Sequence, residues 1–302
     1  MASTESKLLK DAYDGLASVM RAHPDLPIEA TRALMNTVMS SVGAEPEDVT
    51  YSEVSAGGVP ALWCIPAEHA ADRVILYTHG GGFISGSADS HRKLTGHLAR
   101  AAGVRVLSLD YALAPERAYP AAVDDAVTGY RWLLGQGITA EHIATAGDSA
   151  GGGLCTSVVL KLRDLGEPLP AAVMPLSPWY DLELTADAMQ ASRGTGEVVS
   201  IDGLEQMRAA YLQGGDPADP ITNPMRADLA GFPPVLLHAG GAELLACDAE
   251  AFDQRARAAG VDITLFVEPD MEHVYQFGAG RMPEADASIE RMASWVGPKL
   301  GL

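Results

Sequence analysis

The chain has 302 residues, and 47% of them are hydrophobic, which is ample apolar material for a large buried core. Asp and Glu number 40 against 21 Lys and Arg, a formal net charge of −19. This balance excludes a nucleic-acid partner bound through a general basic surface, and it argues against attraction to an anionic membrane. The high apolar content also excludes an intrinsically disordered acidic chain.

Cysteine content and the N-terminal residues indicate the compartment. Cys64, Cys155 and Cys247 are too few and too scattered for a disulfide framework or a zinc cluster, which favours a reducing compartment. The first residues contain no apolar signal-peptide region, and no stretch approaches roughly 18 uncharged apolar residues. We therefore expect a cytoplasmic protein with no membrane-spanning helix.

Two amphipathic helices are predicted before the first strand. Apolar residues recur at helical spacing over residues 4–21 and again from Leu34 to Val42, and Pro24 and Pro27 interrupt the pattern between them. Neither helix is followed at once by a strand. Residues 1–48 are therefore predicted to form an appended helical cap segment.

From residue 49 onward, β-rich runs alternate with helical patterns. Residues 49–56 and 59–65 flank Gly57-Gly58 and predict a hairpin. Further strands are predicted at 73–78, 104–109, 142–146, 172–176, 234–238 and 263–267, and helices at 90–102, 120–134, 149–165, 247–259 and 283–296. Short apolar strands alternating with helices predict an α/β fold, with a mostly parallel eight-stranded sheet covered by helices on both faces.

Residues 180–232 interrupt this alternation with polar stretches, several prolines and a helical patch at 204–211. Ligands of open α/β sheets bind outside the carboxyl ends of the strands, where an insertion would cover them. We therefore predict a catalytic domain made of residues 49–179 and 233–302, with 180–232 as a cap insertion.

A Gly-x-Ser-x-Gly motif lies between a predicted strand and a predicted helix, at Gly147-Asp148-Ser149-Ala150-Gly151. Small residues there allow the sharp turn of a nucleophile elbow, which presents the serine hydroxyl at the edge of the sheet. The alternative is that Ser149 simply caps the helix.

Three glycines follow the predicted strand 73–78, in the run His79-Gly80-Gly81-Gly82. Glycines let backbone N–H groups approach an oxyanion closely, and together with the amide of Ala150 they would form an oxyanion hole. A flexible glycine turn is the alternative, whereas a phosphate-binding loop is disfavoured because no Gly-Lys-Ser/Thr follows.

A serine nucleophile needs a histidine base and an acid that orients it. His273 follows the last predicted strand, whereas the other histidines lie in caps, in helices, at strand starts or inside a strand. Glu243 lies at the turn after strand 234–238, and Asp248 lies one turn into the next helix, where it suits the helix N-terminus. The sequence favours Glu243 as the acid and leaves Asp248 as the alternative.

These motifs resemble those of the hormone-sensitive-lipase-like α/β-hydrolases, also called bacterial family IV esterases. The matching segments are HGGGF at 79–83, DYALAPERAYPAAVDDA at 110–126, GDSAGGG at 147–153, SPWYDL at 177–182, GFPPVLLHAGGAELL at 231–245 and DMEHVYQF at 270–277. The resemblance covers residues 49–300, and the helical N-terminus is similar to the family's cap. Within the family, the sequence is most similar to the monoterpene ε-lactone hydrolases and short-chain carboxylesterases.

The resemblance implies an α/β-hydrolase fold, no metal or other cofactor, and a triad of Ser149, Glu243 and His273. It also implies an oxyanion hole formed by the amides of Gly81, Gly82 and Ala150, with motif support from His79, Gly80 and Asp148. One residue departs from the family pattern, because most members have Asp followed by Pro-Leu where this chain has Glu243-Leu244-Leu245.

The implied activity is hydrolysis of short- to medium-chain acyl esters or lactones through an acyl-enzyme. Apolar residues of the cap and nearby loops are the candidate substrate pocket, although each could equally serve helix packing: Met20, Met35, Met39, Phe83, Trp179, Tyr180, Met207 and Tyr211. As a set, they suggest a small hydrophobic ester or lactone as the partner.

Two other functions remain open. A carbohydrate or small-molecule deacetylase would use the same motifs, and pocket shape would separate it from an esterase. A non-catalytic, receptor-like member would lack the base, so the presence of His273 argues against it. Relatives often dimerise through the sheet edge near residues 263–267, so the resemblance also implies a homodimer.

Overall fold

The computed structural model describes residues 2–191 and 198–302, built around an eight-stranded sheet of order β1-β2-β4-β3-β5-β6-β7-β8. β2 pairs antiparallel with β1 and with β4, and the other neighbours pair parallel. This confirms the predicted α/β class and mostly parallel sheet. The strands are β1 (Val49–Ala56), β2 (Val59–Pro66), β3 (Ala70–Thr78), β4 (Val104–Leu109), β5 (Ile143–Asp148), β6 (Ala172–Leu176), β7 (Val235–Gly240) and β8 (Ile263–Glu268).

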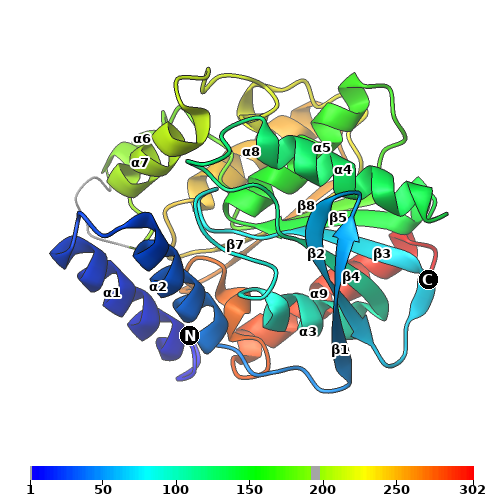
Figure 1. Cartoon of the computed structure of the whole chain (residues 1–302), viewed down its shortest axis with the longest axis horizontal. Helices are drawn as coiled ribbons and strands as arrows, with labels where there is room; N and C mark the ends of the chain where they lie inside the picture. The colour runs from blue at the N-terminus through cyan, green and yellow to red at the C-terminus, as the bar shows by residue number, and fades with distance from the viewer. Residues whose placement is uncertain (1, 192–197) are drawn as a thin grey trace.

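Helices cover both faces of the sheet, as the alternation in the sequence predicted (Figure 1). One face carries α4 (Ala121–Gly135), α5 (Ala150–Asp164) and α8 (Ala246–Ala258), and the other carries α3 (Arg92–Ala102) and α9 (Pro283–Lys299). Strand β3 shows how the two layers form. Val74 and Leu76 pack toward α4 and α5, whereas Ile75 and Tyr77 pack toward α3 and α9, because successive side chains of a strand point to opposite faces.

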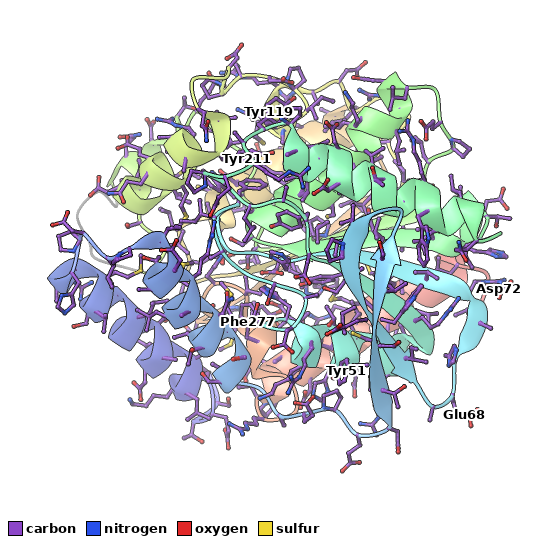
Figure 2. All side chains as sticks on the ribbon, viewed as in Figure 1. Tyr51, Glu68, Asp72, Tyr119, Tyr211 and Phe277 are labelled. Atoms are coloured by element: carbon purple, nitrogen blue, oxygen red, sulfur yellow. The ribbon has the colours of Figure 1, made fainter. Side chains whose placement is uncertain are left out.

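The remaining α-helices of the described chain are α1 (Lys7–Ala22), α2 (Ile28–Ser41), α6 (Asp187–Ala191) and α7 (Ile201–Leu212). All four lie at the same end of the molecule in Figure 1. Tyr211 anchors α7 to the loop before α4. Its carbonyl accepts from the Tyr119 amide at 2.8 Å, and the two rings meet edge to face (Figure 2). Residues 192–197 of the predicted cap insertion lie outside the described residues, and the division into a catalytic domain and two cap segments stays a prediction.

Three short 3-10 turns complete the described elements, at η1 (Ala140–His142), η2 (Pro224–Arg226) and η3 (Tyr275–Gly278). His142 belongs to η1, so the strand predicted to start there begins at Ile143 instead. Within residues 2–191 and 198–302, no helix combines the length and apolar character needed to cross a bilayer. The same part of the chain contains no group of three or more His, Cys, Asp or Glu side chains placed to hold a metal ion.

Candidate active site

Ser149 lies at a sharp turn between β5 and α5, with φ 54° and ψ −123°. This backbone conformation is rare for a residue with a side chain and persists only where the surroundings fix it. Two hydrogen bonds fix it here: the Ser149 amide donates to the Leu176 carbonyl at 2.8 Å, and the Ser149 carbonyl accepts from the Trp179 amide at 3.0 Å. The turn leaves the Ser149 side chain partly exposed to a cavity.

Glycine is required on both sides of this turn because the neighbouring backbone approaches closely. A Cβ atom on Gly147 would lie 2.3 Å from the Gly151 carbonyl oxygen, and one on Gly151 would lie 2.1 Å from the Thr78 carbonyl oxygen. Both contacts involve backbone, which cannot move aside as a flexible side chain could. The two glycines of the motif therefore allow β5, α5 and the end of β3 to meet beneath Ser149.

The glycine loop after β3 lies beside Ser149 and is held by its own backbone. Gly81 and Gly82 have φ values of 114° and 63°. The Gly81 carbonyl accepts from the Ile84 amide at 3.1 Å and from the Ser85 amide and hydroxyl at 3.0 and 2.9 Å. Among the described residues, the amides of Gly81, Gly82 and Ala150 have no hydrogen-bond acceptor. Three donors close to a serine hydroxyl are suited to binding an oxyanion.

The Asp148 side chain connects the glycine loop to the turn that carries Ser149. Its Oδ1 accepts from the Tyr77 hydroxyl at 2.7 Å and from the Gly80 amide at 3.0 Å, and its Oδ2 lies 3.3 Å from His91 Nε2. Burial alone would raise the pKa of the Asp148 carboxyl, but the His91 imidazole and the Tyr77 hydroxyl hold it below its usual range. Asp148 is therefore a buried carboxylate that supports the loop and the elbow together.

His79 supports the glycine loop as a neutral ring. It stacks on Tyr111 with ring centroids 4.3 Å apart, and the Tyr111 hydroxyl donates to the His79 carbonyl at 2.6 Å. Its Nδ1 lies 2.8 Å from the Gly80 carbonyl, which can only accept, so the ring donates there. Burial lowers the pKa of His79 to about 3, which keeps it uncharged at neutral pH.

His273 follows β8 and pairs with Glu243, which follows β7. His273 Nδ1 lies 2.6 Å from Glu243 Oε2, and Glu243 Oε1 accepts from the Gly240 amide at 3.1 Å. The Glu243 side chain is 1% exposed, so water competes little with this contact. A carboxylate on Nδ1 favours the tautomer with Nδ1 protonated and Nε2 free to accept a proton.

Asp248, the alternative acid, is bound elsewhere. Its Oδ2 accepts from the Tyr180 and Asp181 amides at 2.8 and 2.9 Å, which fixes the loop after β6 against the start of α8. Burial raises the pKa of Asp248 to about 7. The structure therefore pairs His273 with Glu243, whereas Asp248 holds the loop after β6.

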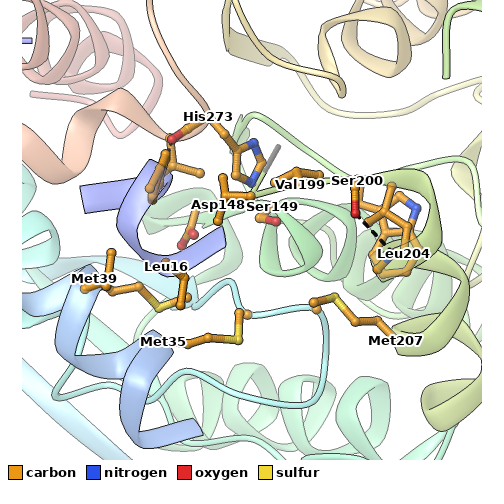
Figure 3. Close-up of a pocket in the computed structure, with 18 of the residues that line it drawn as sticks. Leu16, Met35, Met39, Asp148, Ser149, Val199, Ser200, Leu204, Met207 and His273 are labelled. Atoms are coloured by element: carbon orange, nitrogen blue, oxygen red, sulfur yellow. Dashed lines mark hydrogen bonds between the residues drawn. The ribbon is translucent and has the colours of Figure 1, made fainter. Parts of the chain in front are cut away.

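Ser149 and His273 line one cavity of about 70 Å³, together with Gly81, Gly82 and mostly apolar side chains. Figure 3 shows the His273 ring above Ser149, with Met35 and Met39 on one side and Met207 on the other. α1, α2 and α7 supply much of this apolar wall. The cavity therefore has a polar edge, formed by Ser149 and His273, and mostly apolar walls.

Comparison with known proteins assigns the family. A family model described as the alpha/beta hydrolase fold matches residues 75–277, which is more than half of the chain. The chain belongs to the α/β-hydrolase family. A crystal structure of an esterase from the bacterial hormone-sensitive lipase family is 41% identical to this hydrolase, with a TM-score of 0.92 and full coverage of both chains. The hydrolase is therefore a member of the bacterial hormone-sensitive lipase family, as the sequence motifs implied.

Curated relatives agree with this assignment. The hydrolase is 40% identical over 250 residues to an acetyl-hydrolase of Streptomyces hygroscopicus, and this match covers 83% of this chain and 82% of that protein. It is 33% identical over 233 residues to an esterase of Acinetobacter venetianus, and that match covers 77% of each protein.

The cavity of the hydrolase contains four of the predicted pocket residues: Met35, Met39, Trp179 and Met207. The Met207 sulfur lies so close to Gly82 that a Cβ atom there would meet it at 2.1 Å. Met207 therefore covers the glycine loop directly.

Four other residues predicted for the pocket do not line it. Phe83 and Tyr211 stack on each other with centroids 3.8 Å apart, and both are almost fully buried. The Tyr180 ring packs on Phe252 at 4.3 Å, because its backbone is turned toward α8 by Asp248. Met20 is also absent from the described lining. For Phe83, Tyr180 and Tyr211, the packing alternative considered from the sequence agrees better with the structure.

Sequence reasoning missed several residues that shape the site. Leu16 and Tyr13 on α1 line the cavity, and Arg32 on α2 donates to the Ile84 carbonyl at 2.6 Å, just beyond the glycine loop. His91 falls within the predicted helix 90–102, where the sequence gives it no role, yet it contacts Asp148 from 57 positions away. No local pattern marks such pairs, because each depends on how distant segments meet.

Proposed function

We propose that this hydrolase cleaves short- to medium-chain carboxylic esters through an acyl-enzyme formed on Ser149. The observation that carries the proposal is the 2.6 Å contact between His273 Nδ1 and Glu243 Oε2, at the edge of the cavity that Ser149 also lines. The esterases among its relatives support the same reaction class.

In the proposed reaction, His273 Nε2 takes the hydroxyl proton of Ser149 as Ser149 Oγ attacks the ester carbonyl carbon. Glu243 stabilises the imidazolium that forms. The carbonyl oxygen becomes an oxyanion near the amides of Gly81, Gly82 and Ala150, which stabilise it through hydrogen bonds. When the intermediate collapses, the alcohol leaves with the proton from His273. Water then attacks the acyl-enzyme by the same route and releases the acid.

The substrate is proposed to be a small hydrophobic ester or lactone. The cavity of about 70 Å³ is small and mostly apolar, which favours a short acyl chain. A lactone would open by the same steps, with the acyl and alcohol parts remaining in one product.

Removal of acetyl groups from a carbohydrate or other small molecule is the second candidate function. The acetyl-hydrolase relative from Streptomyces hygroscopicus supports it, and an acetyl group fits a cavity of this size. A receptor-like role is disfavoured because a binding protein has no need of the buried Glu243 carboxylate on His273.

A homodimer formed through the open edge of β8 is a further proposal. β8 ends the strand order, and its residues Thr264–Val267 are half-buried in the single chain. Sedimentation velocity would report the mass in solution, and a monomer at micromolar concentration would contradict the proposal.

A cytoplasmic location stays a prediction from the sequence.

The test of the proposed function is a hydrolysis panel. p-Nitrophenyl acetate, butyrate, octanoate and laurate, together with ε-caprolactone and an acetylated sugar, would be compared between the parent chain and Ser149→Ala. We expect kcat/KM to be highest for a short acyl chain and turnover to be lost in Ser149→Ala. Unchanged turnover in Ser149→Ala would refute the mechanism, and a strong preference for the acetylated sugar would favour the deacetylase.

A further inference from the structure

One peptide group beside the proposed base is held at both of its polar ends by side chains. The His273 carbonyl accepts from the Tyr13 hydroxyl at 2.8 Å, and the Val274 amide donates to Ser177 Oγ at 3.1 Å. The carbonyl and the amide belong to the same planar unit, because the bond between His273 and Val274 joins them. Together the two hydrogen bonds fix how that plane is turned.

The backbone around this peptide is not in a relaxed conformation. Val274 has φ 48°, which is unusual for a β-branched residue, and Ser177 has φ 44°. Such conformations persist where the surroundings determine them. Ser177 is itself anchored, because its amide donates to the His238 carbonyl of β7 at 2.7 Å. The hydroxyls of Tyr13 and Ser177 therefore hold a turn that the local chain would not choose.

The two hydroxyls come from distant parts of the fold. Ser177 follows β6, whereas Tyr13 lies on α1, 260 positions from His273 in the chain. α1 packs against η3, which begins directly after Val274, and the Tyr13 ring lines the cavity beside Ser149. Burial raises the pKa of Tyr13 well above its usual value, so its hydroxyl remains a proton donor.

We propose that Tyr13 and Ser177 are positioning residues that hold the His273–Val274 peptide and thereby aim the His273 imidazole at Ser149. This inference rests on the proposed function, in which His273 is the base. It makes α1 part of the catalytic apparatus as well as a wall of the cavity. A small error in the orientation of a base is costly, because proton transfer requires the donor and acceptor to be aligned.

The test compares Tyr13→Phe with Ser177→Ala, each of which removes a hydroxyl and keeps the rest of the local shape. Tyr130→Phe is the matched control, because the Tyr130 hydroxyl also donates to a backbone carbonyl, that of Pro168 at 3.0 Å, away from the cavity. We expect kcat on p-nitrophenyl butyrate to fall about tenfold in both test variants, with KM changed less than about twofold. Tyr130→Phe should keep the parental kcat.

The pH profile separates positioning from a purely structural role. If His273 loses its alignment with Glu243, its imidazolium is less stabilised, and the acidic limb of kcat should shift to lower pH in both test variants. Tyr130→Phe should leave that limb in place even if it lowers Tm as much as the two test variants do. If Tyr13→Phe fails to fold, Ser177→Ala decides the question.

Parental kcat and an unshifted acidic limb in a folded Tyr13→Phe and in Ser177→Ala would overturn the positioning role. So would an equal loss of kcat in Tyr130→Phe. Ser149→Ala, measured alongside, keeps the two proposals distinct. Turnover that survives in Ser149→Ala overturns the proposed function, whereas an inactive Ser149→Ala with fully active Tyr13→Phe and Ser177→Ala overturns the positioning role alone.

Discussion

Two residues with a strained backbone lie next to the proposed chemistry. Ser149, at φ 54°, is the proposed nucleophile, and Val274, at φ 48°, directly follows the proposed base. Each such residue costs on the order of 1–3 kcal/mol, which the surrounding hydrogen bonds and close packing must offset. Ser149 was predictable because its strain is encoded in flanking glycines, whereas Val274 carries no local sign. The pairing of Glu243 with His273 could be inferred from chain order, but the roles of Tyr13 and Ser177 depend on tertiary contacts alone.

Replacing the acid is the most direct prediction at this scale. Glu243→Gln keeps the shape but removes the charge that stabilises the His273 imidazolium, so kcat should fall by roughly 10³-fold or more. Asp248→Asn keeps an oxygen that can accept from the Tyr180 and Asp181 amides, so kcat should fall by less than about tenfold. Steady-state kinetics, with circular dichroism to verify folding, would measure both. A larger loss of kcat in Asp248→Asn would contradict the assignment of Glu243.

At the level of elements, the sheet was easier to predict than the helices around the cavity. β4 and β6 begin and end where the apolar runs predicted, because a strand covered on both faces is mostly apolar. The apolar residues of α1, α2 and α7 could not be divided between packing and pocket, because both uses need the same side chains. Met207 lines the cavity, whereas Tyr211, one turn later on α7, stacks on Phe83 instead.

Met207 on α7 is expected to limit the acyl chain. Met207→Ala would open space above Gly82, so kcat/KM for p-nitrophenyl octanoate should rise relative to butyrate, at a stability cost of ~1–2 kcal/mol for a half-buried side chain. Met225→Ala on η2 is the control, because Met225 is also half-buried but packs away from the cavity. An unchanged octanoate-to-butyrate ratio in Met207→Ala would show that α7 does not set chain length.

For the molecule as a whole, composition restricted the function without identifying it. The net charge of −19 argues against some classes of partner but does not point to the proposed chemistry, which lies in a small cavity with mostly apolar walls. The α/β class followed from the alternation of strands and helices, because few sheet architectures are compatible with that alternation. The contact between α1 and η3 could not be derived, because nothing local in either segment fixes how the two meet.

Buried histidines make the stability of the whole molecule sensitive to acid. Burial, with a smaller contribution from the charge of Arg291, lowers the pKa of His238 to about 3, so the unfolded chain binds a proton there before the folded chain does. Stability from this residue is present above its unfolded pKa of about 6.5 and is lost as pH falls toward 3. By about pH 5, the loss should reach ~2 kcal/mol.

His238→Gln removes the titrating group and isolates this contribution. The free energy of unfolding should then fall less between about pH 7 and about pH 5, by ~2 kcal/mol relative to the parent chain, whatever the variant's stability at neutral pH. Urea denaturation at both pH values would measure the difference. Equal pH dependence in the two proteins would mean that His238 is not held neutral by the fold.

The central claim is that Ser149 carries the acyl group during turnover, and trapping the acyl-enzyme tests it most directly. The chain would be mixed with p-nitrophenyl acetate, quenched in acid within the first turnover, digested and examined by mass spectrometry. We predict one acetyl group on the peptide containing Ser149, and none on that peptide in Ser149→Ala. Acetylation at a different residue, or turnover with that peptide unmodified throughout, would contradict the account.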